Sequence, residues 1–358
     1  MSSVVSVVGA RPQFIKLFPL SQELKKRDVE HLVIHTGQHY DVNMSDFFFD
    51  EFNLPKPFVN LGVGSGTFAK QISEIMTRLH LALSKIDIAM VLCYGDTNST
   101  LATAICARRM GLKLLHIEAG LRSGDLSMPE EQNRIVADHT SNILLAPTPN
   151  AISNISNEGI TRKSYLVGDL MASSLDMIKD KALTKCKILK KLDLHSKEYL
   201  LLTIHRQENT SNPNTFRTIF KSMKTISKPV IFPIHPRSKK MLKEWEIEKE
   251  VPDNIRLINP VSFSDILVLQ KNAEVIFTDS GGMQKEAMLL STPCITLRNT
   301  TEWIETIDVG ANTLVNIDCQ NILEAYNNMK DKGDFLLPDC FKLRAEILVA
   351  DVIEKELS

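Results

Sequence analysis

Short apolar runs alternate with longer amphipathic stretches along the first half of the chain. The runs that we interpret as buried strands cover residues 4–8, 32–35, 89–94, 113–118 and 143–146. Hydrophobic residues recur with helical spacing between these runs, for example over residues 12–26 and 67–83. Strands that alternate with helices favour right-handed βαβ crossovers and a parallel sheet.

The same pattern starts again after residue 169. The second set of apolar runs covers residues 199–204, 230–234, 255–257, 275–279 and 294–297. The lysine-rich residues 179–197 between the two halves are typical of a solvated helix and a linker. We therefore predict an α/β protein with two Rossmann-like, doubly wound domains that face each other across a cleft.

The predicted N-terminal domain covers residues 1–168, and the predicted C-terminal domain covers residues 169–340. Residues 341–358 have helical spacing with no strand after them, and we expect this helix to pack back on the N-terminal domain. Ligands bind to such sheets at the carboxyl ends of the strands. Residues directly after the strands are therefore the candidates for chemistry.

Composition narrows the class of protein. A chain of 358 residues is long enough for two hydrophobic cores, and its formal net charge of -1 indicates no attraction to nucleic acid or to an anionic membrane. No apolar run approaches the roughly 20 residues that span a bilayer. The six cysteines are scattered without a CxxC pair, as is typical of a reducing compartment. We expect a cytoplasmic protein.

The first candidate for anion binding is the segment Gly-Ala-Arg-Pro-Gln-Phe-Ile-Lys, which follows the first predicted strand. Gly9 allows a tight turn, and Pro12 suits the first position of a helix, whose free amides would point outward. Arg11 and Lys16 add positive charge, so the segment could hold an anion. A plain strand-to-helix turn with solvated cations explains the segment equally well.

A second strand, turn and helix, at residues 275–287, is a stronger candidate for a diphosphate. Its turn, Ser280-Gly281-Gly282, lets phosphate oxygens approach the backbone at the positive end of a helix. Glu286 lies in the first turns of that helix, where its carboxylate either accepts from both hydroxyls of a ribose or only complements the helix dipole. The chain has no GxxxxGK[ST] motif, which argues against a P-loop.

Three carboxylates are candidates for acid/base chemistry. Asp96 and Glu118 follow consecutive predicted strands, and Glu130 opens the next helix, so we expect all three at one rim of the sheet. Crowded carboxylates repel, so one of them can stay protonated while another acts as a base. In a purely structural interpretation, Asp96 only caps a helix, while Glu118 and Glu130 pair with Arg122 and Arg134.

Two histidines, His205 and His235, end strands of the second predicted domain. Lone histidines are usually structural, but these two lie where a ligand is expected. The histidines and cysteines have no metal-ligand spacing, so we predict no metal site. The chain also lacks the Gly-x-Ser-x-Gly motif of a nucleophile elbow.

Taken in order, these segments resemble the non-hydrolysing UDP-N-acetylglucosamine 2-epimerase family. The resemblance runs from Gly9 to about Glu305 and rests on the segments GARPQFIK, HTGQHY, GDTNST, HIEAGLRS, PEEQNR, IHRQEN, IHPRS, DSGGMQKEA and RNTTEW. Each segment alone is weak evidence, but nine in this order are highly specific. The resemblance implies a glycosyltransferase-B-like fold with the active site between two Rossmann-like domains.

The resemblance also implies an isomerase that acts on a UDP-sugar without a cofactor. UDP leaves by anti elimination across C1–C2, and it adds again to the 2-acetamidoglucal after a proton returns to the opposite face. The family's acid/base and oxyanion-handling positions correspond to Asp96, Glu118, Glu130 and His205. Its substrate-binding positions correspond to Arg11, Lys16, Arg134, Ser280, Gly281, Gly282 and Glu286. We also assign His235 to substrate binding, and we expect a homodimer.

Some positions depart from the best-known branch of this family. Where this chain has Trp303, that branch has Arg. Where this chain has Ile266 and Gln207, that branch has an aromatic residue and a second Arg. The segments GARPQFIK, GQHYDVNMS and YGDTNST look closer to the branch acting on UDP-2,3-diacetamido-glucuronate, so this sugar is an alternative substrate. The chain could also be a retaining glycosyltransferase, a hydrolysing epimerase or a non-catalytic nucleotide-sugar sensor.

Overall fold

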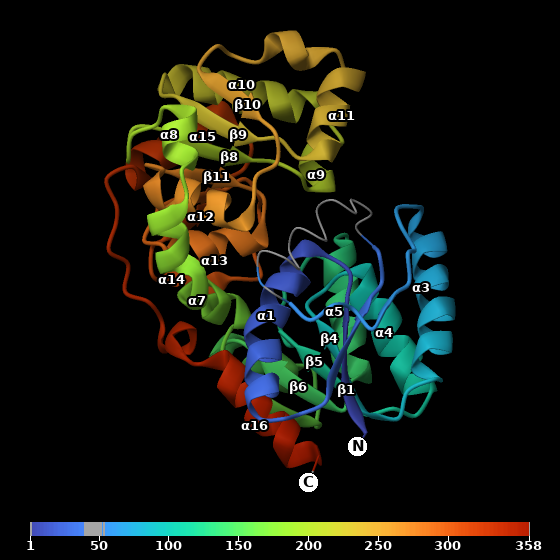
Figure 1. The fold of residues 1–358 in the computed structure, drawn as a ribbon. Helices are drawn as coiled ribbons and strands as arrows, with labels where there is room; N and C mark the ends of the chain where they lie inside the picture. The colour runs from blue at the N-terminus through green and yellow to red at the C-terminus, as the bar shows by residue number, and fades with distance from the viewer. Residues whose placement is uncertain (1, 39–51, 53, 358) are drawn as a thin grey trace. The chain divides into compact units, whose positions relative to one another are not determined.

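The computed structural model describes residues 2–38, 52 and 54–357. The chain forms two compact units, one of Met1–Met177 with Asp339–Ser358 and the other of Ile178–Pro338 (Figure 1). Each unit contains one parallel sheet with helices between its strands. The prediction of two Rossmann-like α/β folds is thereby confirmed.

The sheet of the first unit has the strand order β3-β2-β1-β4-β5-β6-β7, and all its neighbours pair in parallel. Its strands are β1 (Ser3–Val8), β2 (His31–His35), β3 (Val59–Asn60), β4 (Ile88–Tyr94), β5 (Leu114–Ile117), β6 (Ile143–Ala146) and β7 (Lys163–Leu166). The central strand β1 is buried along its whole length, as expected of a strand covered by helices on both faces.

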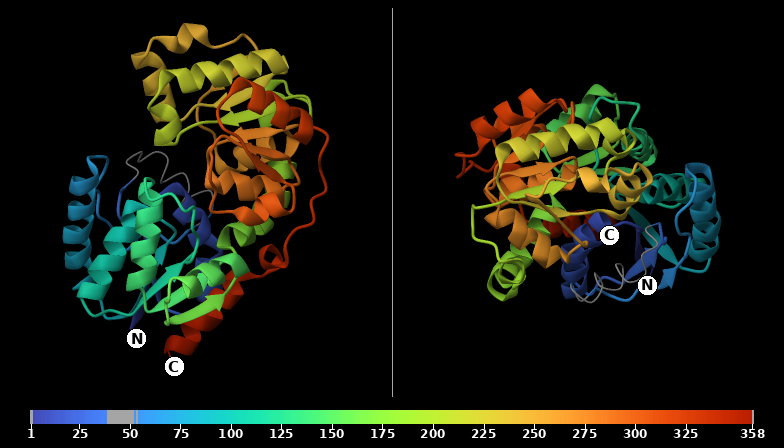
Figure 2. Two further views of the ribbon diagram at one scale, coloured as in Figure 1. Left: turned by 180° about the vertical axis from the view of Figure 1, so that it is seen from behind. Right: turned by 90° about the horizontal axis from the view of Figure 1, so that it is seen from above.

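The helices of the first unit connect these strands and cover the sheet. They are α1 (Arg11–Lys26), α3 (Phe68–Leu83), α4 (Asn98–Arg109), α5 (Pro129–Thr140), α6 (Pro149–Asn157), α7 (Leu170–Lys185) and α16 (Ala345–Leu357). In Figures 1 and 2 the red helix α16 lies beside the blue helix α1. Arg27, at the end of α1, donates to Asp351 at 2.6 Å and to Glu354 at 2.7 Å, which ties the two helices together.

The first unit continues to Met177, past the boundary expected at residue 168. The reason is the packing of the first half of α7 on α1. The hydroxyl of Ser174 donates to the carbonyl of Ile15 at 2.6 Å, and Ser174 is fully buried. No helix in the described part of the chain is both long and apolar enough to cross a membrane.

The sheet of the second unit has the order β10-β9-β8-β11-β12-β13, which matches the order β3-β2-β1-β4-β5-β6 of the first. Its strands are β8 (Leu200–Thr203), β9 (Val230–Pro233), β10 (Ile255–Ile258), β11 (Ile276–Thr278), β12 (Cys294–Thr296) and β13 (Asn312–Leu314). Its helices are α8 (Ile188–Leu192), α9 (Gln207–Thr210), α10 (Pro213–Ile226), α11 (Pro236–Glu244), α12 (Phe263–Asn272), α13 (Gly281–Leu289), α14 (Ile304–Asp308) and α15 (Cys319–Met329).

Candidate functional site

The strand order of each sheet reverses at one point, and the candidate residues follow the strands beside it. In the first unit the reversal lies between β1 and β4, and in the second between β8 and β11. At this point the chain leaves two neighbouring parallel strands toward opposite faces of the sheet. This leaves a crevice at their carboxyl ends, where open α/β sheets bind ligands. A ligand is therefore expected near the residues that follow β1, β4, β8 and β11.

The turn from β1 into α1 is held by the side chain of Gln13. Its Oε1 accepts from the amides of Gly9 at 2.7 Å and Ala10 at 3.1 Å, and its Nε2 donates to the carbonyl of Tyr94 at 2.8 Å. This buried side chain fixes the start of α1 against the end of β4. Arg11, at the start of the helix, is half-buried, and Lys16 is buried in the next turn.

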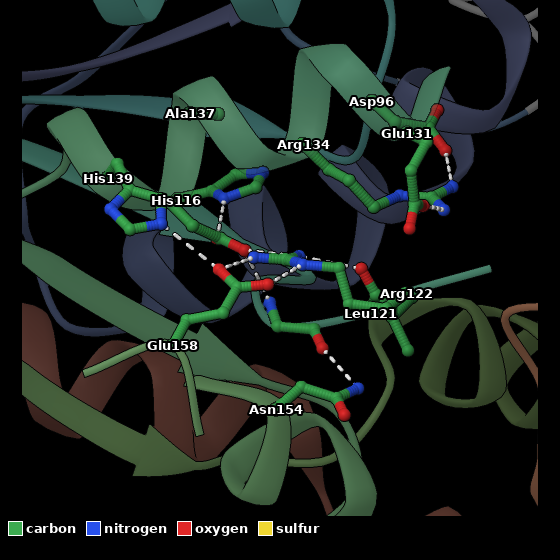
Figure 3. Close-up of polar contacts among 12 residues, drawn as sticks. Asp96, His116, Leu121, Arg122, Glu131, Arg134, Ala137, His139, Asn154 and Glu158 are labelled. Carbon is green, nitrogen blue, oxygen red and sulfur yellow. Dashed lines mark hydrogen bonds and ion pairs between the residues drawn. The ribbon is translucent and has the colours of Figure 1, made fainter. Parts of the chain in front are cut away.

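Asp96 lies in the turn after β4, where it forms an ion pair with Arg134 of α5 (Figure 3). The side chain of Arg134 is only 2% exposed, whereas that of Asp96 is 30% exposed. The side-chain amide of Asn133 also donates to the carbonyl of Asp96 at 2.9 Å. A charge-assisted contact with a buried guanidinium favours the ionised carboxylate.

Glu118 follows β5 and forms an ion pair with Lys16, and both side chains are largely buried. Its backbone has a φ of 69°, a left-handed conformation that is uncommon for residues other than glycine. The amides of Glu118 and Ala119 both donate to the carbonyl of Leu145, at 3.0 and 3.1 Å. The surrounding structure thus holds a strained residue, which costs about 1–3 kcal/mol and is a feature of functional sites.

Glu130 lies at the start of α5, where it is half-buried, and the next residue, Glu131, is buried. The carboxylate of Glu131 accepts from the amides of Ser123 at 3.0 Å and Gly124 at 2.9 Å, and it lies 2.8 Å from Arg134. Glu131 therefore anchors both the preceding loop and the partner of Asp96, a role that the sequence did not reveal.

The structural roles of the carboxylates differ from those that the sequence suggested. Thr97, not Asp96, caps α4, because its side chain accepts from the amide of Thr100. Glu118 pairs with Lys16, whereas Arg122 bonds to other carboxylates.

In the second unit, α13 begins directly after the turn that follows β11. Ser280 is its N-cap residue, so the amides of the first turn lie at the positive end of the helix. A side chain added at Gly281 would collide with the carboxylate of Glu302 and would contact the indole of Trp303. Gly281 is thus required by the packing behind the turn, whereas the sequence had attributed it only to room for phosphate.

Trp303 is one of the positions at which this chain departs from the best-known branch. Its ring is 2% exposed and lies under Lys285 of α13, whose ammonium is 3.6 Å from the ring centroid. A buried cation over an indole ring is a stabilising contact. The next residue of α13, Glu286, is 6% exposed and accepts from Gln270 at 2.6 Å.

His205 follows β8 and is oriented by Asp279, which follows β11. Nδ1 of His205 lies 3.0 Å from the Asp279 carboxylate, which also accepts from the amides of His205 and Arg206 at 2.9–3.1 Å. Burial alone would raise the pKa of Asp279, but the His205 ring and these amides bring the pKa below its ordinary value. An ionised Asp279 requires a proton on Nδ1, so Nδ1 donates to the carboxylate and Nε2 is the ring nitrogen on the side away from Asp279.

His235 is exposed and lies near His205, with 5.6 Å between the ring centroids. Its Nδ1 accepts from the amide of Arg237 at 3.2 Å, so the ring caps α11. In the described part of the chain, no group of three His, Cys, Asp or Glu side chains is arranged to hold a metal ion. The predicted segment HTGQHY covers residues 35–40, and its last two residues, like the loop after it over residues 41–45, lie outside the described residues.

Two Rossmann-like sheets, a carboxylate set with buried cations and a glycine turn at a helix N-terminus define an α/β enzyme of the nucleotide-sugar class. The profile of the family described as UDP-N-acetylglucosamine 2-epimerase matches residues 22–338. The chain belongs to this family of isomerases, with its glycosyltransferase-B-like fold.

Individual relatives cover almost the whole chain. A UDP-N-acetylglucosamine 2-epimerase homolog of Methanococcus maripaludis is 45% identical over 90% of each chain. The UDP-2,3-diacetamido-2,3-dideoxy-D-glucuronate 2-epimerase of Pseudomonas aeruginosa is 37% identical, again over 90% of each chain. The crystal structure of Methanocaldococcus jannaschii UDP-GlcNAc 2-epimerase in complex with UDP-GlcNAc and UDP has a TM-score of 0.93 and 38% identity, covering 98% of this chain and 99% of that chain.

Proposed function

We propose that this protein is a non-hydrolysing epimerase that inverts C2 of UDP-N-acetylglucosamine, giving UDP-N-acetylmannosamine, for surface polysaccharide precursors. The observation that carries the proposal is the pair of carboxylates Asp96 and Glu118. They follow the neighbouring strands β4 and β5, and each forms an ion pair with a buried cation. Family membership supports the substrate class, because the relatives are named for epimerisation of UDP-linked acetamido sugars.

In the proposed reaction, a base removes the proton on C2 while the bond from C1 to the UDP oxygen breaks. The products of this step are UDP and a 2-acetamidoglucal. An acid then returns a proton to the opposite face of C2, and UDP adds again to C1. We assign the proton transfers to Asp96, Glu118 and Glu130, and we assign handling of the leaving oxygen to His205, whose Nε2 would donate a hydrogen bond to that oxygen.

We assign substrate binding to the ends of α1 and α13. The amides after Ser280, at Gly281 and Gly282, would receive the diphosphate, and Glu286, oriented by Gln270, would accept from the ribose hydroxyls. The remaining assigned contacts to the substrate are those of Arg11, Lys16, Arg134 and His235.

The second candidate substrate is a UDP-2,3-diacetamido-glucuronate. The observations that favour it are the 37% identity to the Pseudomonas aeruginosa enzyme named for that sugar and the replacement of an expected Arg by Trp303. The two candidates differ at C3 and C6 of the sugar and not in the proposed chemistry at C2.

The test is proton NMR of the purified protein in deuterated water, with each UDP-sugar supplied alone. An epimerase exchanges the C2 proton for deuterium and forms the C2 epimer, and the better substrate exchanges faster. A glycosyltransferase needs an acceptor, a hydrolysing enzyme releases free N-acetylmannosamine, and a sensor shows no turnover. Any of these three results would contradict the proposal.

We also propose a cytoplasmic homodimer. All six cysteines are unbridged, which is usual in a reducing compartment. Light scattering coupled to size exclusion gives the mass directly, and a monomer at micromolar concentration would contradict the dimer.

A further inference from the structure

His116, labelled in Figure 3, lies on β5 and is fully buried, and both of its ring nitrogens are hydrogen bonded. Nδ1 lies 2.6 Å from Oδ1 of Asp138, and Nε2 lies 2.7 Å from the carbonyl oxygen of Gly95. A carbonyl oxygen only accepts, so Nε2 carries a proton. The proton state of Nδ1 therefore decides whether the ring is charged.

The Arg122 guanidinium on its other oxygen favours the ionised form of Asp138, and an ionised carboxylate beside Nδ1 places a proton on that nitrogen as well. This other oxygen of Asp138 accepts from the amide of Gly120 at 3.0 Å and from Arg122 at 2.7 Å. Burial alone would raise the pKa of Asp138, but His116 and Arg122 bring the pKa below its ordinary value. An imidazole that donates from both nitrogens is an imidazolium.

The charges of the surrounding cluster agree with this state. Arg122 also binds Glu158 through two bonds, at 2.5 and 2.8 Å. With His116 protonated, the buried pair of His116 and Asp138 is balanced in charge. A neutral ring would turn its Nδ1 lone pair toward a carboxylate oxygen, which is unfavourable for buried groups.

One acceptor of His116, the Gly95 carbonyl, belongs to the turn that carries Asp96, and the other, Asp138 of α5, bonds the turn that carries Glu118. Gly95 directly precedes Asp96, and Asp138 holds the amide of Gly120, two residues after Glu118. Gly95 and Gly120 have φ values of 61° and 82°, which glycine adopts without strain, whereas Glu118 has a φ of 69°, which the surrounding contacts must maintain.

We propose that His116 is a protonated positioning residue that links the turn before Asp96 to the turn after Glu118 and so fixes the distance between the two carboxylates. The proposal rests on the proposed function, because it concerns the geometry of those carboxylates. His116 itself does not touch the substrate, since it is fully buried behind both turns.

The protonation state is tested without any reference to activity. Nitrogen-15 NMR of the histidine rings in the wild-type protein, with H116Q to assign the signal, should show protons on both nitrogens of His116 at neutral pH. A ring with one proton would contradict the protonated state of His116 and would leave the proposed function untouched.

The positioning role is tested with H116Q and D138N, measured with UDP-GlcNAc. D138N keeps the shape of the carboxylate but removes its charge, and it serves if H116Q does not fold. We expect kcat to fall about 100-fold, as for a misplacement of about 1 Å, while KM and the Kd for UDP change less than about threefold. The control is H139Q. His139 lies next to Asp138 on α5, and its exposed ring bonds Glu158 at 3.1 Å.

A structural role alone would lower the melting temperature and leave kcat at the level of H139Q in the folded protein. That result in both variants would overturn the proposal. Absence of turnover by the wild-type protein with every UDP-sugar would instead contradict the proposed function, and the NMR result would still stand.

Discussion

The two units place different kinds of groups at the carboxyl ends of two sheets with the same strand order. In the first unit, the turns after β4 and β5 present carboxylates with buried cationic partners, Arg134 and Lys16. In the second unit, the turn after β11 presents backbone amides at a helix N-terminus, and the turn after β8 presents a histidine oriented by Asp279. In the proposed function, the same strand order would serve side-chain proton transfer in one unit and anion binding in the other.

The largest expected effect comes from neutralising the carboxylates of the first unit. Asp96→Asn, Glu118→Gln and Glu130→Gln each remove an ionisable group and keep its shape, so kcat should fall about 100- to 10,000-fold. The Kd for UDP should change little, because we assign UDP to the second unit. Steady-state kinetics and calorimetry measure the two quantities.

Glu74→Gln is the control for this set, because Glu74 is a carboxylate of the same unit that pairs with Arg78 on the surface of α3. The deuterium incorporated at C2 should fall in step with kcat in the three site variants. Near-normal turnover in all three would show that these carboxylates serve only as structural partners of Arg134 and Lys16.

The next effect concerns the histidine of the second unit. His205→Asn removes the Nε2 donor that we assign to the leaving oxygen, and kcat should fall by about 100-fold, at the low end of the range for a proton-transfer group. His235→Asn keeps a good N-cap for α11, so a rise in KM without a stability change would report a lost substrate contact. Equal kinetics of His205→Asn and wild type would remove His205 from the mechanism.

A smaller effect is expected from Gly281→Ala at the turn into α13. The added methyl group meets the carboxylate of Glu302, and such overpacking costs about 1–3 kcal/mol and distorts the turn. If the distorted turn loses a similar amount of binding free energy for UDP, the Kd for UDP rises about 10- to 100-fold. Gly333→Ala is the matched control in the same unit, because its added carbon has no neighbour within 4 Å. Unchanged UDP affinity in folded Gly281→Ala would place the diphosphate elsewhere.

The smallest effect compares the acid stability of the two units. Asp138 and Asp279 have pKa values below the unfolded value of about 3.9, so their stabilisation is present above about pH 4 and is lost as the pH falls through the folded pKa. Each unit of depression contributes about 1.4 kcal/mol. Urea unfolding near pH 7 and near pH 3 should show a weaker pH dependence in Asp138→Asn and Asp279→Asn than in wild type, and an unchanged dependence would contradict the assignment.

The sequence predicts the central strands well and the edges poorly. Each predicted strand is present, whereas β3, β7 and β13 were not predicted, and all three are edge strands. An edge strand has fewer covered positions and so lacks a continuous apolar run. β7 has mainly exposed side chains and β3 has two residues, so neither had a hydrophobic pattern to detect.

In the site, sequence reasoning found the residues that follow strands but not the residues that orient them. Asp96, Glu118 and His205 could be proposed because they follow recognisable strands. Asp138 and Asp279 could not be identified as the groups that orient these turns, because their partners lie far along the chain: Asp138 bonds His116 across 22 positions, and Asp279 bonds His205 across 74. Local sequence spacing contains no information about such pairings.

The packing of α16 on α1 has a consequence for the order in which the protein is made. The first unit lacks its last helix until the ribosome has synthesised the whole of the second unit, roughly 10 to 40 seconds later at about 5–20 residues per second. During that interval the nascent chain exposes the face of α1 that α16 later covers, including the guanidinium of Arg27 that Asp351 and Glu354 will bind. The second unit, encoded later, can therefore finish folding before the first, and chaperone binding to the emerging chain should concentrate on α1.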